Sequence, residues 1–240
     1  MAAEEDEPDF GESMSKAPAW SYSSISLFDQ CPKKYYHLRV AKDVKEPTST
    51  AMLYGSDMHL AAEKYIRDGD PLPGKYLYAK DMLDRLNAIP GKKLCEYEMG
   101  VKYEGGKIIP CGFHDPDRYW RGIADLLIID EENHSARLVD YKTGKSAQYA
   151  DTKQLRLLAG ATFAHFPSIK TIKAGLLFVV AQDFVKEDYE GATPESYFEP
   201  FHPIVDQLSE CHKNDVWNPK RNFTCKGWCP VLECVHNGKR

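Results

Sequence analysis

The stretch Gly122-Ile123-Ala124-Asp125-Leu126, followed fifteen residues after its aspartate by Asp140-Tyr141-Lys142-Thr143-Gly144-Lys145, decides the fold of this chain. Each aspartate adjoins a run of leucine, isoleucine or valine, which predicts two neighbouring β-strands inside a covered sheet. Residues i and i+2 of a strand lie on one face, so Asp140 and Lys142 are expected to project together while Tyr141 points the other way.

This pattern of two acids and a lysine is typical of a divalent-cation site. Carboxylate oxygens suit Mg²⁺ or Mn²⁺, which are usually held by one or two carboxylates together with water and a substrate phosphate. Such a cation lowers the pKa of its bound water and draws charge from a phosphodiester, and a neighbouring lysine offsets further charge. The alternative is an ordinary strand ion pair between Asp140 and Lys142, worth under about 1 kcal/mol.

Length and composition indicate one globular domain. The chain has 240 residues, of which 42% are hydrophobic, and contains no run of about 18 apolar residues that would cross a membrane. We interpret residues 1–16 as a disordered acidic tail and residues 17–240 as a single domain. Because the first residues are acidic where a secretory signal is basic, a cytoplasmic protein is expected, in the host cytoplasm if phage-encoded.

The net charge of −5 is concentrated at the start of the chain. Residues 1–12 hold six acids and no base, and without them 30 acids remain against 31 lysine and arginine residues. The body of the protein is therefore near neutral, and binding of nucleic acid would depend on local basic patches.

Hydrophobic periodicity predicts an α/β fold, a mixed central β-sheet flanked by helices. Residues 174–181 are wholly apolar, which predicts a central strand covered on both faces. Asp151 and Thr152 are suited to cap a helix that begins directly after them. The other expected elements are helices over 55–66 and 76–86, a meander of strands over 94–103, 122–130 and 136–142, and helical pieces opened by Pro194 and Pro203.

Five motifs in this order resemble the PD-(D/E)XK nuclease superfamily and, within it, the RecB-like exonuclease branch, with phage-encoded members the most similar. The resemblance covers nearly all of residues 20–235 and is carried by Ser23 to Tyr36, Gly55 to His59, Gly122 to Asp125, Val139 to Lys145, and Gln154-Leu155. It implies a restriction-endonuclease-like core and an enzyme that hydrolyses DNA with Mg²⁺ or Mn²⁺, as an exonuclease acting at ends.

The resemblance also implies a role for each matching residue. Asp125 and Asp140 would ligate the cation, joined by His59 and by the backbone carbonyl of Tyr141. Lys142 would position or help to deprotonate the attacking water, and Gln154 would contact DNA or a ligand water. An acidic position before the Asp125 strand falls on Glu96 or Glu98, and we favour Glu96.

Plainer interpretations of two of these residues stay open. His59 lies four residues before Glu63 on the expected helix, so the two side chains would also pair on an exposed face. Gln154 would equally be a helix residue that faces solvent.

Three of the seven cysteines, Cys225, Cys229 and Cys234, are crowded near the C-terminus. A metal bound by these thiolates would stabilise a segment that has little core of its own. The resemblance supplies Cys31 as a fourth ligand and implies a [4Fe–4S] cluster joining the N- and C-terminal segments. The spacing of three and then four residues differs from the family's usual two and then five. A structural Zn²⁺ held with either Cys31 or His236 is therefore an alternative, as are three reduced thiols.

The expected partner is DNA, single- or double-stranded, bound at its ends, with recombination or helicase proteins as further partners and no membrane. Lysines and tyrosines mix at residues 33–36, a composition that suits single strands, although for Tyr35 and Tyr36 we slightly favour burial in the core. Two other functions remain open. One is a non-catalytic DNA- or protein-binding module that has kept the fold, and the other is a CRISPR-adaptation-type nuclease that acts only within a complex.

Overall fold

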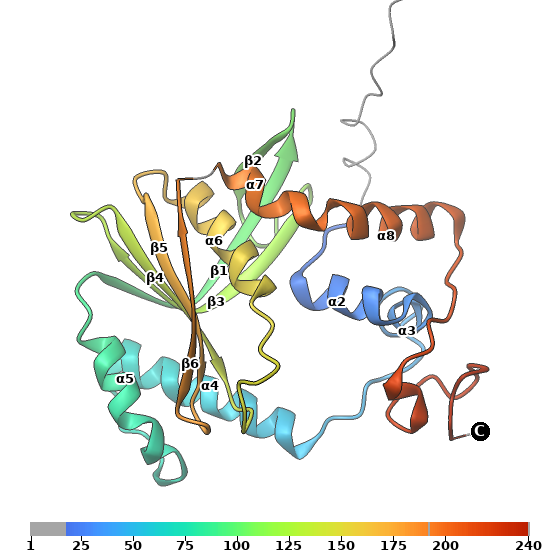
Figure 1. Ribbon diagram of the computed structural model, residues 1–240, viewed down its shortest axis with the longest axis horizontal. Helices are drawn as coiled ribbons and strands as arrows, with labels where there is room; N and C mark the ends of the chain where they lie inside the picture. Colours follow the sequence, from blue (N-terminus) through green and yellow to red (C-terminus); the bar gives the residue numbers. More distant parts are fainter. Residues whose placement is uncertain (1–17, 192, 240) are drawn as a thin grey trace, which may run out of the picture.

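A single mixed sheet with helices on both faces forms the protein (Figure 1). The computed structural model describes residues 18–191 and 193–239, so the tail expected over residues 1–16 lies outside the described part. The strand order is β2-β1-β3-β4-β5-β6, in which β4 and β5 are parallel and all other neighbours are antiparallel. The predicted fold class is confirmed.

The predicted strands are present, and the structure adds two at the edges of the sheet. The expected meander corresponds to three adjacent strands, and the apolar strand lies between β4 and β6, inside the sheet. The two edge strands, β2 and β6, were not predicted from the sequence. The strands are β1 (Lys92–Glu104), β2 (Lys107–Cys111), β3 (Trp120–Asp130), β4 (Ser135–Lys142), β5 (Thr171–Phe178) and β6 (Asp183–Glu190).

Helices cover the two faces of the sheet and divide the core into two parts. On one face, α4 (Thr50–Asp68), η2 (Gly74–Ala79) and α5 (Lys80–Asn87) pack against β3, β4 and β5. On the other face lie α2 (Tyr22–Gln30), α6 (Lys153–His165), α7 (Pro194–Phe198) and α8 (His202–Asn214). The short segments are α3 (Pro32–Tyr35), η1 (Tyr36–Val40), η3 (Glu199–Phe201) and η4 (Phe223–Lys226).

The N-terminal and C-terminal segments lie side by side. Asn222 Nδ2 donates to the carbonyl of Gln30 over 3.0 Å, and Lys220 Nζ donates to the carbonyl of Asp29 over 2.7 Å. Residues 215–239 contain little regular structure beyond η4, so their placement depends on such contacts with α2 and α3.

None of the described helices is long and apolar enough to cross a bilayer.

Candidate metal centre

Three acidic residues from three adjacent strands stand level with one another. Cys95 pairs with Leu126 and Tyr97 with Ala124, so Glu96 and Asp125 lie between the same two pairs. The pairing of β3 with β4 ends at Leu126 and Val139, and Asp125 and Asp140 are the next residues beyond it. Side chains opposite one another on neighbouring strands lie close together. The sheet thus carries a row of three acids, whereas the two strand motifs alone predict only the pair Asp125 and Asp140.

The regular alternation of the strands breaks at this row. Leu94 and Tyr97, three residues apart, both pack into the core on the α6 side, and so do Ala124 and Leu127. Glu96 lies between the first two with a φ of 48°, a left-handed conformation that non-glycine residues rarely adopt. Backbone strain of this kind costs on the order of 1–3 kcal/mol and is concentrated at functional sites.

Helix α4 brings His59 to the row. Ser49 caps the start of the helix, Gly69 ends it in a left-handed conformation, and Met58, Ala62 and Ile66 bury one of its sides against the sheet. His59, next to Met58, is thereby held over the ends of the acidic residues. Its Nε2 lies 2.9 Å from the carbonyl oxygen of Tyr141, and its Nδ1 lies 3.4 Å from Asp125 Oδ2.

His59, Glu96 and Asp125 form a compact group of potential ligands. One ligand atom of each lies within 4.8 Å of the others. Asp125 is further fixed because its Oδ2 accepts a hydrogen bond of 2.6 Å from the backbone N–H of Tyr141. Two carboxylates and an imidazole in this arrangement are suited to a divalent cation.

Asp140 and Lys142 form an ion pair beside this group. Lys142 Nζ lies 2.5 Å from Asp140 Oδ2, and the carboxylate is almost completely buried. The side chain of Tyr141 points to the opposite face and packs in the core beneath α4, so the predicted orientation of these three residues is confirmed. Asp140 itself is not part of the compact group.

The electrostatics of the row favour a positively charged occupant. Burial raises the pKa of Glu96 to about 7, with a further contribution from the charge of Asp125. Burial and then Asp125 also raise the pKa of Asp140 to about 6, although Lys142 acts in the opposite direction. Burial acts to lower the pKa of His59, but its contact with Asp125 outweighs that effect and the pKa is raised. Carboxylates crowded in this way are relieved by a cation.

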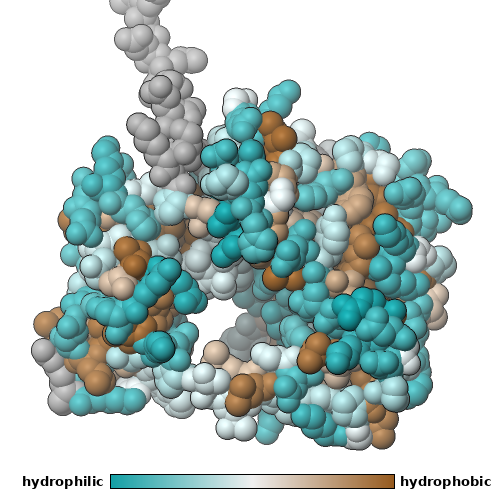
Figure 2. All heavy atoms as spheres, turned by 180° about the vertical axis from the view of Figure 1, so that it is seen from behind, coloured by the Kyte–Doolittle hydropathy of each residue, from teal (hydrophilic) through white to brown (hydrophobic). Residues whose placement is uncertain are grey.

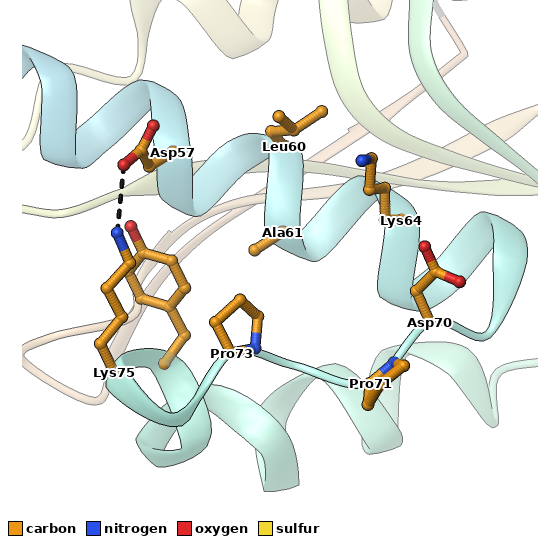
Figure 3. Close-up of a pocket in the computed structure, with 9 residues that line it drawn as sticks. Asp57, Leu60, Ala61, Lys64, Asp70, Pro71, Pro73 and Lys75 are labelled. Atoms are coloured by element: carbon orange, nitrogen blue, oxygen red, sulfur yellow. Dashed lines mark hydrogen bonds and ion pairs between the residues drawn. The ribbon is translucent and has the colours of Figure 1, made fainter.

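The site opens to solvent through a cavity of about 420 Å³ beside α4, lined by Gly55, Ser56, His59, Leu60, Glu63 and Glu96. A second pocket of about 280 Å³ lies between α4 and η2, where Lys75 reaches Asp57 (Figure 3). None of the residues of the compact group lines this second pocket.

The remaining predicted residues differ in their relation to the site. Glu98 is exposed on β1, outside the compact group. Gln154 is half-buried in the first turn of α6, and among the described hydrogen bonds none joins its side chain to the site. Glu63 pairs with Arg67, and its side chain lines the cavity. The sequence suggests Glu63 only as a partner of His59 on an exposed face. The i, i+4 spacing of the two residues on α4 is nevertheless the signal that Glu63 lies near the site.

Cys31, Cys225, Cys229 and Cys234 are all buried and line one cavity, although 193 residues lie between the first and the second. Cys31 Sγ accepts hydrogen bonds from the backbone N–H groups of Lys34 and Lys220, over 3.5 and 3.4 Å. In the described part of the chain, no three of these sulfurs lie within 4.8 Å of one another. His236 also lines the cavity, while the other cysteines, Cys95, Cys111 and Cys211, do not.

Two of the basic and aromatic residues 33–36 are buried. Lys34 is buried and forms an ion pair of 2.8 Å with Glu46, and Tyr35 is buried against Phe28 and Trp217. The interpretation of these tyrosines as core residues therefore holds for Tyr35.

Comparison with known proteins gives one family match. The PD-(D/E)XK nuclease superfamily matches residues 19–90 and 77–234. Two solved structures are similar at low identity. SSO0001 is 14% identical with a TM-score of 0.49, covering 91% of this chain and 87% of that one. A "Putative exonuclease" from Eubacterium rectale is 11% identical with a TM-score of 0.48, covering 98% and 92%. No curated protein matches the chain. Since the family match spans most of the sequence, including every strand of the acidic row, the chain belongs to the PD-(D/E)XK nuclease superfamily.

Proposed function

We propose that this protein is a RecB-like nuclease that hydrolyses phosphodiester bonds of DNA with Mg²⁺ or Mn²⁺, working from ends. The observation that carries the proposal is the compact group formed by His59, Glu96 and Asp125, of which His59 and Glu96 line a solvent-accessible cavity. Membership of a nuclease superfamily supports hydrolysis as the reaction. The metal, the DNA substrate and the preference for ends are our inference.

The donor set fits a hard divalent cation. His59 Nε2 and the Tyr141 carbonyl oxygen lie 2.9 Å apart, at hydrogen-bond distance, so one cation would be within reach of both atoms. We therefore assign His59, Asp125 and the Tyr141 carbonyl as ligands, with Glu96 alongside and Asp140 completing the acidic environment. A bound cation lowers the pKa of water and withdraws charge from the scissile phosphate.

Lys142 supplies a positive charge to the site in addition to the cation. Its ammonium group lies 2.5 Å from the buried carboxylate of Asp140, which orients it toward the acidic row. In that position it orients the attacking water and offsets negative charge that develops on the phosphate oxygens. Gln154, at the start of α6, is the proposed contact to DNA or to a ligand water.

A cleavage assay tests the proposal. Wild-type protein is incubated with end-labelled linear DNA and Mg²⁺ or Mn²⁺, beside Asp125→Asn and the matched control Glu98→Gln, an exposed carboxylate nearby on β1. We expect cleavage that chelation abolishes, a loss of at least about a thousandfold in Asp125→Asn, and a wild-type rate in the control. Cleavage by Asp125→Asn at the wild-type rate would contradict the proposed site. Metal binding without any cleavage would favour a non-catalytic DNA-binding module.

We also propose that Cys31, Cys225, Cys229 and Cys234 hold a [4Fe–4S] cluster. The four cysteines line one cavity, and the backbone N–H donors to Cys31 are of the kind that tune iron–sulfur centres. The resemblance to the RecB-like branch favours the cluster over zinc. Structural Zn²⁺ is the alternative, and analysis of the bound metal distinguishes zinc from iron.

A further inference from the structure

A second pocket beside the candidate metal centre has the features of a small-ligand site. On the face shown in Figure 2, hydrophobic residues form separate patches among hydrophilic ones, which is ordinary for a protein surface. The pocket instead gathers apolar side chains around a space of about 280 Å³ between α4 and the residues that lead into η2 (Figure 3). Ligand pockets are typically about 300–1,000 Å³ in volume, so this one, which we call the side pocket, suits a single small group.

Tyr76 provides the side pocket with a buried polar group that has no partner. The side chain is 1% exposed and lines the pocket, yet no described residue forms a hydrogen bond with its hydroxyl. The neighbouring tyrosines differ, since the hydroxyls of Tyr54 and Tyr78 lie 2.6 Å apart and satisfy one another. A buried hydroxyl without a partner costs free energy, and a ligand bound in the pocket would supply the missing hydrogen bond.

The charges around the side pocket cancel, which disfavours an ion as its occupant. Asp57 and Lys75 form an ion pair of 3.1 Å at one end, and Lys64 and Asp70 stand at the other end (Figure 3). A phosphate would meet two carboxylates there, and a metal ion would meet two ammonium groups. The lining therefore favours a neutral group that both donates and accepts hydrogen bonds.

A nucleobase meets these requirements. It is neutral, its flat faces pack against apolar side chains, and its edges carry both donors and acceptors. In the side pocket, Leu60 and Pro73 supply apolar surface, Lys64 donates and Asp70 accepts. The hydroxyl of Tyr76 does either, so it suits any base edge that reaches it.

Helix α4 sets the side pocket next to the cavity of the metal centre. His59 and Glu63 line the metal cavity, whereas Ala61 and Lys64 line the side pocket. Leu60, which is 50% exposed, lines both and forms the ridge between them. A nucleotide that lies across Leu60 would thus have its phosphate on the side of the metal ligands and its base on the other side.

We propose that the side pocket holds one unstacked base of the substrate strand, next to the phosphate at the metal centre. The inference rests on the proposed nuclease function and adds a base subsite to it. It accounts for the unpartnered hydroxyl of Tyr76, the balanced charges and the shared Leu60, none of which the metal chemistry requires.

Ligand-observed NMR tests the subsite without any cleavage. The full chain in EDTA is mixed with each of the four deoxynucleosides, and separately with deoxyribose 5-phosphate and with inorganic phosphate, which lack a base. We expect saturation transfer from the protein to the base protons of at least one deoxynucleoside and none to the sugar phosphate. Transfer to the sugar phosphate alone, or to none of the probes, would overturn the proposal.

Two substitutions place the bound base in the side pocket. Tyr76→Phe keeps the ring and removes only the unpartnered hydroxyl, so Tm should be unchanged or higher while deoxynucleoside affinity falls about fivefold. Ala61→Phe, which fills the pocket from α4, should abolish binding. The control is Tyr103→Phe, a half-buried tyrosine in the other part of the core, which should bind as wild type does. Wild-type affinity in Tyr76→Phe, or in a folded Ala61→Phe, would contradict the assigned pocket.

An abasic nucleotide separates this proposal from the nuclease function. An end-labelled single strand with one abasic position is digested with Mg²⁺ or Mn²⁺ beside the intact strand. We expect a product to accumulate at one fixed distance from the abasic position, where the missing base would occupy the side pocket. Digestion of both strands with identical product patterns would overturn the subsite alone. Deoxynucleoside binding without any cleavage of either strand would contradict the nuclease function alone.

Discussion

Glu96 shows how one residue decides the geometry of the site. Strict alternation would set Glu96 and Glu98 on the same face of β1, so the sequence alone does not distinguish them. The left-handed turn at Glu96 breaks the alternation and directs this carboxylate toward His59 and Asp125. The sequence pattern carries no signal for a positive φ at glutamate, which is why Glu98 stays open as an alternative to Glu96 until the structure is known.

The role of Lys142 should be distinguishable by experiment from that of the metal ligands. Lys142→Met is expected to lower kcat by at least about a hundredfold, because the water loses its positioning and the phosphate its counter-charge. Metal-induced thermal stabilisation should persist, since the compact group does not include the lysine. The exposed Lys173 on β5 provides the control Lys173→Met. A loss of metal stabilisation in Lys142→Met would show that the lysine acts through the metal site and not beside it.

The elements that carry the site were the most predictable because they combine apolar runs with special residues. β3, β4 and α4 appear where the periodicity indicates them, and Pro32 begins α3 as a first-turn proline can. The two edge strands were missed for a physical reason. β6 alternates exposed and half-buried positions and is rich in acids, while β2 is five residues long and contains Pro110, a residue that only an edge strand tolerates.

Helix α8 contains a titrating group that should make stability depend on pH. Burial lowers the pKa of His212, whose ring packs edge-on against Trp217 with centroids 4.8 Å apart. As the pH falls below the ordinary histidine pKa of 6.5, the unfolded chain binds a proton before the folded chain does, so folding stability decreases. His212→Phe should lose less stability between neutral pH and about pH 5 than wild type does, as measured by thermal unfolding. Parallel pH profiles for the two proteins would exclude this contribution.

The four clustered cysteines connect the two ends of the fold, a relation that no local pattern predicts. Sequence spacing identified three of them, and only the resemblance to a family supplied Cys31. If a [4Fe–4S] cluster joins the two segments as we propose, Cys31→Ser should lose iron and broad visible absorption. Its Tm should also fall by several degrees, because a ligand that binds only the folded state stabilises it. Cys211→Ser, outside the cavity, should retain all three properties. A colourless wild-type protein with stoichiometric zinc would contradict the iron–sulfur assignment.

A hydrogen bond from the hydroxyl of Tyr22 to the carboxylate of Asp151 joins α2 to the segment between β4 and α6, a contact between distant residues that no periodicity predicts. The acidic row likewise combines neighbouring strands with helix α4. This arrangement has the proposed function only if a cation occupies the compact group.

Calorimetric titration with Mn²⁺ tests that occupancy most directly. We predict that wild-type protein binds Mn²⁺ at a site that His59→Ala, Glu96→Gln and Asp125→Asn each weaken, while Glu98→Gln binds as wild type does. The three substitutions act on one group of atoms that lie within 4.8 Å of one another, so their effects should be non-additive when they are combined. Undiminished Mn²⁺ binding in all three variants would contradict the metal centre and, with it, the mechanism.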